Sequence, residues 1–124
     1  MSFTITSNNK NDHLFLRSVG VVEDTQDVIK HAEAVYAEIT KYDKKKILID
    51  DRETRWPPNL FSYYEQVEFF SQNFPPEIRL LKIAIVLPAE SEEVAKFWET
   101  LCVNMGFNYH AFISIEEAYQ WLTK

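Results

Sequence analysis

The sequence predicts an α/β domain in which a mixed five-stranded sheet carries four helices, in the order ββαβαβαβα. Two patterns support this: short apolar runs typical of strands, and longer segments whose apolar residues recur every three or four positions. From residue 13 onward the two kinds alternate, which predicts parallel strands joined by helices. We expect a single domain over residues 1–124, because 46% of the residues are apolar and can supply one core.

The first half of the chain predicts a hairpin, a helix and a strand. "FTIT" (3–6) and "HLFLRSVGVV" (13–22) read as strands separated by the polar turn "SNNKND". A helix follows over residues 23–42, with Asp24 or Thr25 as its N-terminal cap. "KILID" (46–50) is a short apolar strand of the kind that is covered on both faces. The predicted inward face of the helix is Val28, Ala32, Val35, Tyr36 and Ile39.

The second half predicts three helices and two strands. A helix over 59–74 is capped by Asn59 and ended by the prolines at 75 and 76. Residues 80–87 form the central strand, 91–105 a helix ended by Gly106, and 107–113 a strand. Ser114 and Glu117 make a capping box for the last helix. The expected inward residues are Leu60, Tyr63, Tyr64, Val67, Phe70 and Phe74 in the first of these helices, and Val94, Phe97, Trp98, Leu101 and Met105 in the second.

Composition excludes several classes of function. A net charge of −6 argues against nucleic acid, which binds basic surfaces. Two glycines are too few for a phosphate-binding loop, and no histidine or cysteine pair has zinc-ligand spacing, so we expect no cofactor and no metal. The longest apolar run, "IAIVL", is too short to span a membrane. The single cysteine and the absence of signal-peptide features in the first ten residues favour the cytoplasm.

Catalytic residues are not evident in the sequence, and we expect a protein that is not an enzyme. Cys102 follows Trp98 by four positions on an apolar helix face, which favours an inert core thiol over a nucleophile paired with His110. The acidic pair of "ILIDD" ends the third predicted strand, whereas phospho-receiver domains carry theirs on the first. Only a convergent cluster of Asp50, Glu53 and His110 would revive an enzymatic hypothesis.

The element order resembles that of the STAS domain, the fold of anti-sigma-factor antagonists and of sulfate-transporter tails. The resemblance covers nearly the whole chain and rests on "SVGVVEDTQDVIKHAEAVY" and "ILIDDRE", while "FISIEEAYQWL" looks like the end of the SpoIIAA-like branch. It implies a STAS/SpoIIAA-like fold and a regulatory, non-catalytic role. In the antagonists a serine in an Asp-Ser motif is phosphorylated at the start of the helix after the third strand. Here that place reads "WPPNLFS", where Ser62 is the nearest serine, so the switch does not carry over.

The segment 51–59 is predicted to be a loop that leaves the carboxyl end of a parallel strand, where open α/β sheets bind their ligands. Its arginines and tryptophan are residue types that contribute strongly to interfaces. The alternative is that Asp51 and Glu53 only pair with the arginines at the surface while Trp56 packs over the next helix. The predicted partner- or ligand-binding residues are Asp51, Arg52, Arg55, Trp56, Asn59 and Ser62.

Two functions follow as hypotheses. The first is a regulatory or protein-interaction module that binds another protein at this loop, for which Trp56→Ala is expected to abolish binding and preserve folding. The second is a carrier of a small hydrophobic, lipid-like ligand, with a pocket under the aromatic helix at 59–74. A homo-oligomer is compatible with either, because the first strand is a possible sheet edge.

Overall fold

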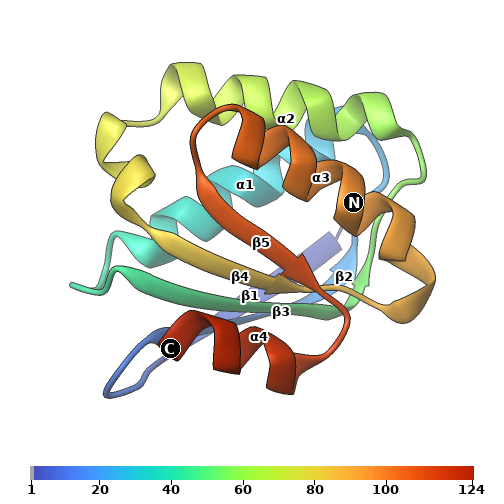
Figure 1. Cartoon of the computed structure of the whole chain (residues 1–124). Coiled ribbons are helices and arrows are strands. Elements are labelled where there is room, and N and C mark those ends of the chain that lie inside the picture. The colour runs from blue at the N-terminus through green and yellow to red at the C-terminus, as the bar shows by residue number, and fades with distance from the viewer. Residues whose placement is uncertain (1) are drawn as a thin grey trace.

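A computed structural model describes residues 2–124 and shows one five-stranded sheet with its strands in sequence order (Figure 1). β1 (Ser2–Asn9) and β2 (Leu14–Val21) are antiparallel, and β2, β3 (Lys46–Arg55), β4 (Lys82–Val86) and β5 (Asn108–Phe112) run parallel. The predicted mixed sheet and element order are confirmed. β1 lies at one edge of the sheet, as expected, and β5 lies at the other.

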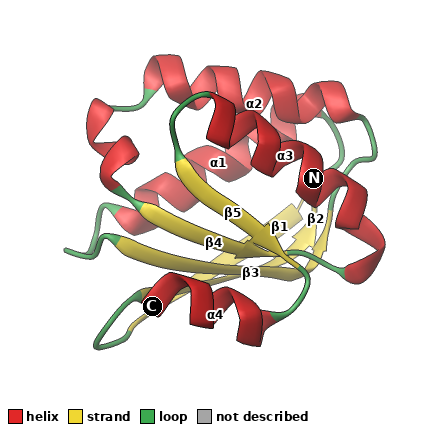
Figure 2. Cartoon of the chain, in the orientation of Figure 1, coloured by secondary structure: helices red, strands yellow, loops and turns green. Residues whose placement is uncertain are grey.

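Three helices cover one face of the sheet and one covers the other (Figure 2). α1 (Thr25–Ile39), α2 (Leu60–Asn73) and α3 (Glu92–Asn104) each connect two neighbouring parallel strands. Because such connections share one hand and the strand order advances in one direction, all three helices lie on the same face. α4 (Ile115–Thr123) follows the last strand and packs alone on the opposite face.

Each face of the sheet carries its own hydrophobic core. Ile47 and Ile49 of β3 point into the large core under the three helices, whereas Leu48 points into the small core under α4. The small core is completed by Ala84, Val86, Ala118 and Leu122, all buried. β3 is therefore covered on both faces, as its apolar run predicts. None of the helices in residues 2–124 is both long and apolar enough to cross a membrane.

The helix ends follow the expected capping chemistry. The side chains of Asp24, Asn59 and Ser114 accept hydrogen bonds from backbone amides in the first turns of α1, α2 and α4. Gly106 ends α3 with a φ of +88°, a left-handed conformation that side chains other than glycine rarely adopt.

Three expectations about local structure are wrong. β3 continues to Arg55, so residues 51–55 belong to a strand and not to a loop. Tyr64 and Met105 are exposed by 44% and 37%: Tyr64 lies at the margin of its helical stripe, and Met105 follows the last residue of α3. Leu80 belongs to a short 3₁₀ helix (Pro76–Leu80) that precedes β4, and its side chain is exposed.

Candidate functional site

The six predicted site residues separate into an exposed and a buried group. Arg52, Arg55 and Asn59 are exposed and Trp56 is half-buried, whereas Asp51 and Ser62 are buried. The hydroxyls of Ser62 and Thr25 share a 2.7 Å hydrogen bond, which joins α2 to the start of α1. The two buried residues cannot belong to the surface site that the loop prediction implied, because the continued strand turns Asp51 inward.

A bulge in β3 explains this inward position. Between two residues of β2, Arg17 and Val19, the partner strand advances by three residues, from Asp50 to Glu53. Strand alternation places Asp51 on the same face as Ile49, and the extra residue lets Thr54 face inward as well. Glu53 lies on the exposed side and forms an ion pair with Arg17.

Arg52, Arg55 and Trp56 line a depression at the carboxyl ends of β2 and β3, whereas Asn59 is not part of its wall. This carboxyl-end depression has a volume of about 450 Å³, and its wall includes Arg52, Glu53, Arg55, Trp56, Val21 and Glu90. It lies where parallel sheets of this kind bind their ligands. The place predicted for the site therefore holds a concave surface.

The two arginines of the depression differ in their surroundings. Arg52 makes two 2.9 Å hydrogen bonds to Asp50. Burial raises the pKa of the Asp50 carboxyl, but the hydrogen bonds from Arg52 outweigh burial and the pKa lies below its ordinary value. Arg55 has no ion-pair partner within residues 2–124 and its side chain is exposed. Arg55 is thus the cation of this surface that a ligand can neutralise.

An internal cavity of about 80 Å³ lies beneath α2, between the three helices and the sheet. At one end its wall carries four polar side chains, those of His31, Asp51, Trp56 and Gln66. The rest of its wall is mainly apolar and includes Ile39, Phe74, Ile78 and Leu81. The expected pocket under the 59–74 helix exists, although its volume is well below the roughly 300–1,000 Å³ of sites for drug-sized ligands.

Asp51 is the most unusual group in the cavity wall. The residue is 0% exposed, and neither carboxyl oxygen has a hydrogen-bond partner within residues 2–124. The Trp56 indole nitrogen is also buried without a partner. Burial, followed by the charge of neighbouring Asp50, raises the pKa of Asp51 well above its ordinary value. Buried polar groups are nearly always hydrogen-bonded, so two unpaired ones beside one cavity indicate an unfilled polar site.

His31 connects these two groups. Its Nε2 lies 4.0 Å from Asp51 Oδ1, and its ring centroid lies 4.8 Å from that of Trp56. Thr54 donates to Ser18, and Ser18 in turn is 2.8 Å from His31 Nε2. Burial lowers the pKa of His31 to about 4, so the imidazole is neutral, and in the tautomer that leaves Nε2 unprotonated it accepts the Ser18 hydroxyl hydrogen. His31 was not predicted as a site residue, although a histidine on the apolar stripe of its helix was a readable signal.

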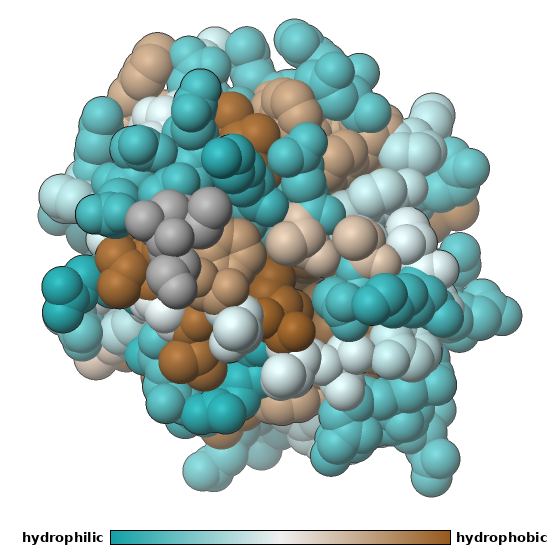
Figure 3. Space-filling model, turned by 180° about the vertical axis from the view of Figure 1, so that it is seen from behind, coloured by the Kyte–Doolittle hydropathy of each residue, from teal (hydrophilic) through white to brown (hydrophobic). Residues whose placement is uncertain are grey.

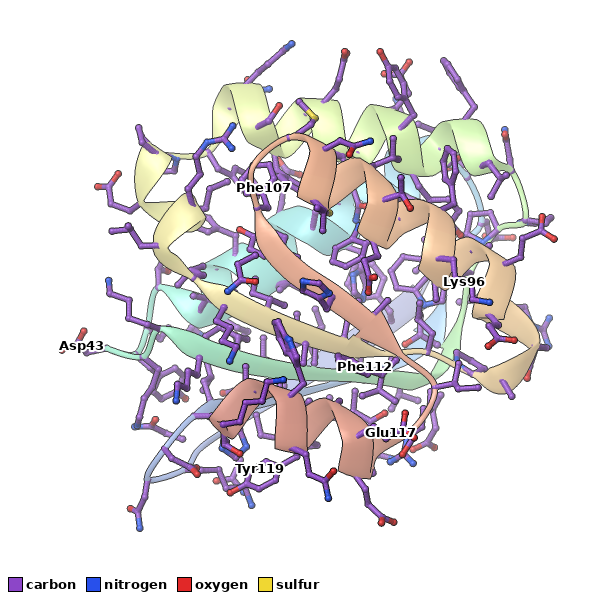
Figure 4. The ribbon with its side chains drawn as sticks, in the orientation of Figure 1. Asp43, Lys96, Phe107, Phe112, Glu117 and Tyr119 are labelled. Atoms are coloured by element: carbon purple, nitrogen blue, oxygen red, sulfur yellow. The ribbon has the colours of Figure 1, made fainter. Side chains whose placement is uncertain are left out.

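A second polar group lies at the opposite end of the sheet. Asp12 joins His13 Nδ1 at 2.7 Å and accepts a 2.9 Å hydrogen bond from Tyr119 of α4, whose side chain lies near the β1–β2 turn (Figure 4). These residues border an open depression of about 820 Å³. The sequence did not predict this group, because 107 positions separate Asp12 from Tyr119. Its hydrogen bonds join the turn to α4.

The residues considered for catalysis have separate partners. Asp50 pairs with Arg52, Glu53 with Arg17, and His110 lies 3.5 Å from Glu99. Cys102 is fully buried, and burial raises the pKa of its thiol. In the described part of the chain, no group of three or more histidine, cysteine and acidic side chains could hold a metal ion.

Comparison with known proteins identifies the fold. No protein-family model matches the chain, and no curated protein sequence does. Among solved structures, an anti-sigma factor antagonist from Mycobacterium paratuberculosis matches with a TM-score of 0.64 at 9% identity, over 99% of this chain and 96% of that one. An uncharacterised protein of the DUF3478 family with a SpoIIAA-like fold, from Shewanella loihica, matches with a TM-score of 0.55 at 15% identity, over 97% and 93%. The resemblance noted in the sequence is thereby confirmed at the level of the fold.

Proposed function

We propose that this SpoIIAA-like domain is a non-catalytic regulatory module that binds another protein at the carboxyl-end depression. The observation that supports the proposal best is the exposed Arg55 guanidinium, which has no ion-pair partner in residues 2–124, beside the half-buried Trp56. Arginine and tryptophan contribute much of the binding energy at protein interfaces. One protein of similar fold is an anti-sigma factor antagonist, a regulator of another protein, which favours the same class of role.

The partner is expected to present a carboxylate to Arg55. In the view from behind, hydrophilic side chains cover much of the visible surface and apolar side chains gather in limited areas (Figure 3). A protein with a net charge of −6 repels acidic partners at long range, so a local attraction to one unpaired arginine would select the docking site. The exposed pair Phe61 and Tyr64 lies on α2, which begins just after Trp56, and could extend the contact.

We further propose that docking does not depend on phosphorylation of Ser62. The residue is 1% exposed and its hydroxyl is bonded to Thr25. A kinase would have to open the contact between α1 and α2 to reach it.

The test is co-purification of tagged protein with partners from cells of its own source, comparing the wild type, Arg55→Glu and Lys45→Glu. Lys45 is a matched control because it is exposed, carries the same charge and precedes β3 at the opposite end of the sheet. We expect Arg55→Glu to lose a partner that wild type and Lys45→Glu retain, and the interaction to weaken as salt is raised. Equal recovery with both variants, at equal thermal stability, would overturn the assignment of this surface.

A further inference from the structure

We propose that the cavity beneath α2 is a binding site for a small uncharged molecule with a hydroxyl or amide head group and a short apolar body. Asp51 and Trp56 both belong to the cavity wall, and three of their atoms are buried without a hydrogen-bond partner: the two carboxyl oxygens of Asp51 and the indole nitrogen of Trp56. Both residues lie beside the His31 ring.

The chemistry of these groups selects the head group. An indole N–H only donates, so the ligand must offer an acceptor. The Asp51 carboxyl, when it holds a proton, donates through its O–H and accepts at its other oxygen, so a ligand group that both accepts and donates satisfies it best. A hydroxyl or a primary amide does both. An ammonium ion cannot accept from Trp56, and a carboxylate would bury its charge without a cationic partner.

The remaining wall determines the body of the ligand. Beyond the polar end the cavity is lined by aliphatic and aromatic side chains, among them Ile39, Phe74, Ile78 and Leu81. An apolar cavity of about 150 Å³ accommodates benzene, so about 80 Å³ accommodates roughly three or four non-hydrogen atoms. A molecule of the size of 1-propanol fits this volume, whereas a lipid chain does not.

Charge favours a neutral ligand. The His31 ring is neutral, and the burial that raises the pKa of Asp51 disfavours any isolated charge in the cavity. His31 and Gln66 also line the polar end, but His31 is bonded to Ser18 and Gln66 to the Trp98 indole. The buried atoms without a partner at this end belong to Asp51 and Trp56, and these a ligand can pair.

The experiment follows the three tryptophan indole N–H signals by NMR during titration with 1-propanol. Trp56 and Trp98 line the cavity, whereas Trp121 packs in the small core under α4 and serves as an internal control. We expect saturable shifts of the Trp56 signal with a dissociation constant in the millimolar range, as befits so small a ligand, and no shift at Trp121. Propylammonium, propanoate and 1-chloropropane have similar bodies and different head groups, and each should bind about tenfold more weakly.

Three variants distinguish head-group recognition from simple filling of a cavity. Asp51→Leu should abolish the preference for 1-propanol over 1-chloropropane, whereas Asp51→Asn, whose amide both donates and accepts, should retain it. Asp50→Asn changes the neighbouring carboxyl outside the cavity and should behave as wild type. A shift of Trp56 that never saturates, or an unchanged preference in Asp51→Leu, would overturn the proposal and leave water as the occupant. Because Arg55 is not part of the cavity wall, failure here leaves the proposed docking surface untouched.

Discussion

Asp51 shows how one side chain can depart from its sequence context. It stands in a run of charged residues, "DDRETR", that suggests a solvated surface, yet the strand continues through this run and alternation turns Asp51 into the core. Its neighbour Asp50 points the other way and pairs with Arg52. A buried carboxyl without a hydrogen bond costs folding free energy, and such groups persist mostly where they serve a function.

Asp51 and His31 together predict an unusual dependence of stability on pH. The pKa of Asp51 is raised above its ordinary value and that of His31 is lowered from 6.5 to about 4, so the folded pair holds one proton at any pH above 4 at which Asp51 is still protonated. Between about pH 4 and 6.5 the unfolded chain holds its one proton on His31, so the pair contributes no slope. Above pH 6.5 the unfolded chain holds none, so wherever Asp51 still keeps its proton in the fold the free energy of unfolding should fall as the pH rises, by at most about 1.4 kcal/mol per pH unit.

Asp51→Asn removes the carboxyl and isolates the His31 contribution. The free energy of unfolding of the variant should rise from pH 4 to 6.5, because in this range the unfolded imidazole holds a proton that the folded one lacks. Above pH 6.5 these groups should add no further dependence on pH. The stability of the variant relative to wild type should therefore rise steadily with pH from about pH 4. Urea unfolding at a series of pH values measures this difference. A difference that is constant from pH 4 to 8 would contradict the raised pKa. The other titratable side chains of the cavity wall are Tyr36 and Tyr109.

Trp56 illustrates a correction to the experiment suggested by sequence. The indole packs against His31 and Tyr63 and lines both the cavity and the carboxyl-end depression. Replacing it by alanine would enlarge the cavity and cost roughly 3–5 kcal/mol, so loss of binding in Trp56→Ala would not separate folding from recognition. Arg55 avoids this difficulty because its side chain is exposed.

At the scale of the element, α2 is held in place by its start. The side-chain oxygen of Asn59 accepts a 3.0 Å hydrogen bond from the amide of Phe61, and Tyr63 donates to the carbonyl of Pro57. Asn59 was predicted both as a cap and as a site residue, and the structure confirms the cap. Because α2 covers the cavity, the cap at Asn59 helps to hold both the cavity and the carboxyl-end depression, which Trp56 lines.

Asn59→Ala and Asn59→Asp should therefore differ. Alanine removes the cap and should lower the free energy of unfolding by about 1 kcal/mol, whereas aspartate keeps the acceptor and adds a negative charge favoured at a helix N-terminus. Thermal and urea unfolding of the two variants measure the difference. Equal destabilisation by both substitutions would show that the hydrogen bond to Phe61 is not what stabilises α2.

At the scale of the whole molecule, the sheet divides the protein into two unequal cores. The large core lies under α1, α2 and α3 and contains the cavity, whereas the small one depends on α4 alone. α4 is joined to the rest by burial of Ala118 and Leu122, by a hydrogen bond from Lys82 to the carbonyl of Trp121, and by the contact of Tyr119 with Asp12. The packing of α4 on its face of the sheet should thus depend on few side chains.

Leu122→Ala tests this dependence. Leu122 is 0% exposed in the small core, and its truncation should cost 2–5 kcal/mol. Leu80→Ala is the matched control, since the same side chain is 67% exposed there and its loss should change stability by no more than about 0.5 kcal/mol. Equal effects in urea unfolding would mean that α4 contributes little to the fold.

The sequence by itself determined the order of the elements, their caps and which helix faces turn inward, because each depends on residues close together in the chain. Apolar periodicity located α1 and α2, and Gly106 and Asn59 marked helix ends from their own chemistry. It also predicted the carboxyl end of β3 as the place to seek a site.

Tertiary structure alone decided which side chains of that place are available. The length of β3 depends on hydrogen bonds with β2, and the bulge opposite Arg17 and Val19 depends on a pairing between segments more than 30 residues apart. These contacts buried Asp51, left Arg55 exposed, and placed the His31 of a distant helix beside the carboxyl. Local patterns contain no information on such pairings, because the energies that fix them arise only when the strands and helices pack together.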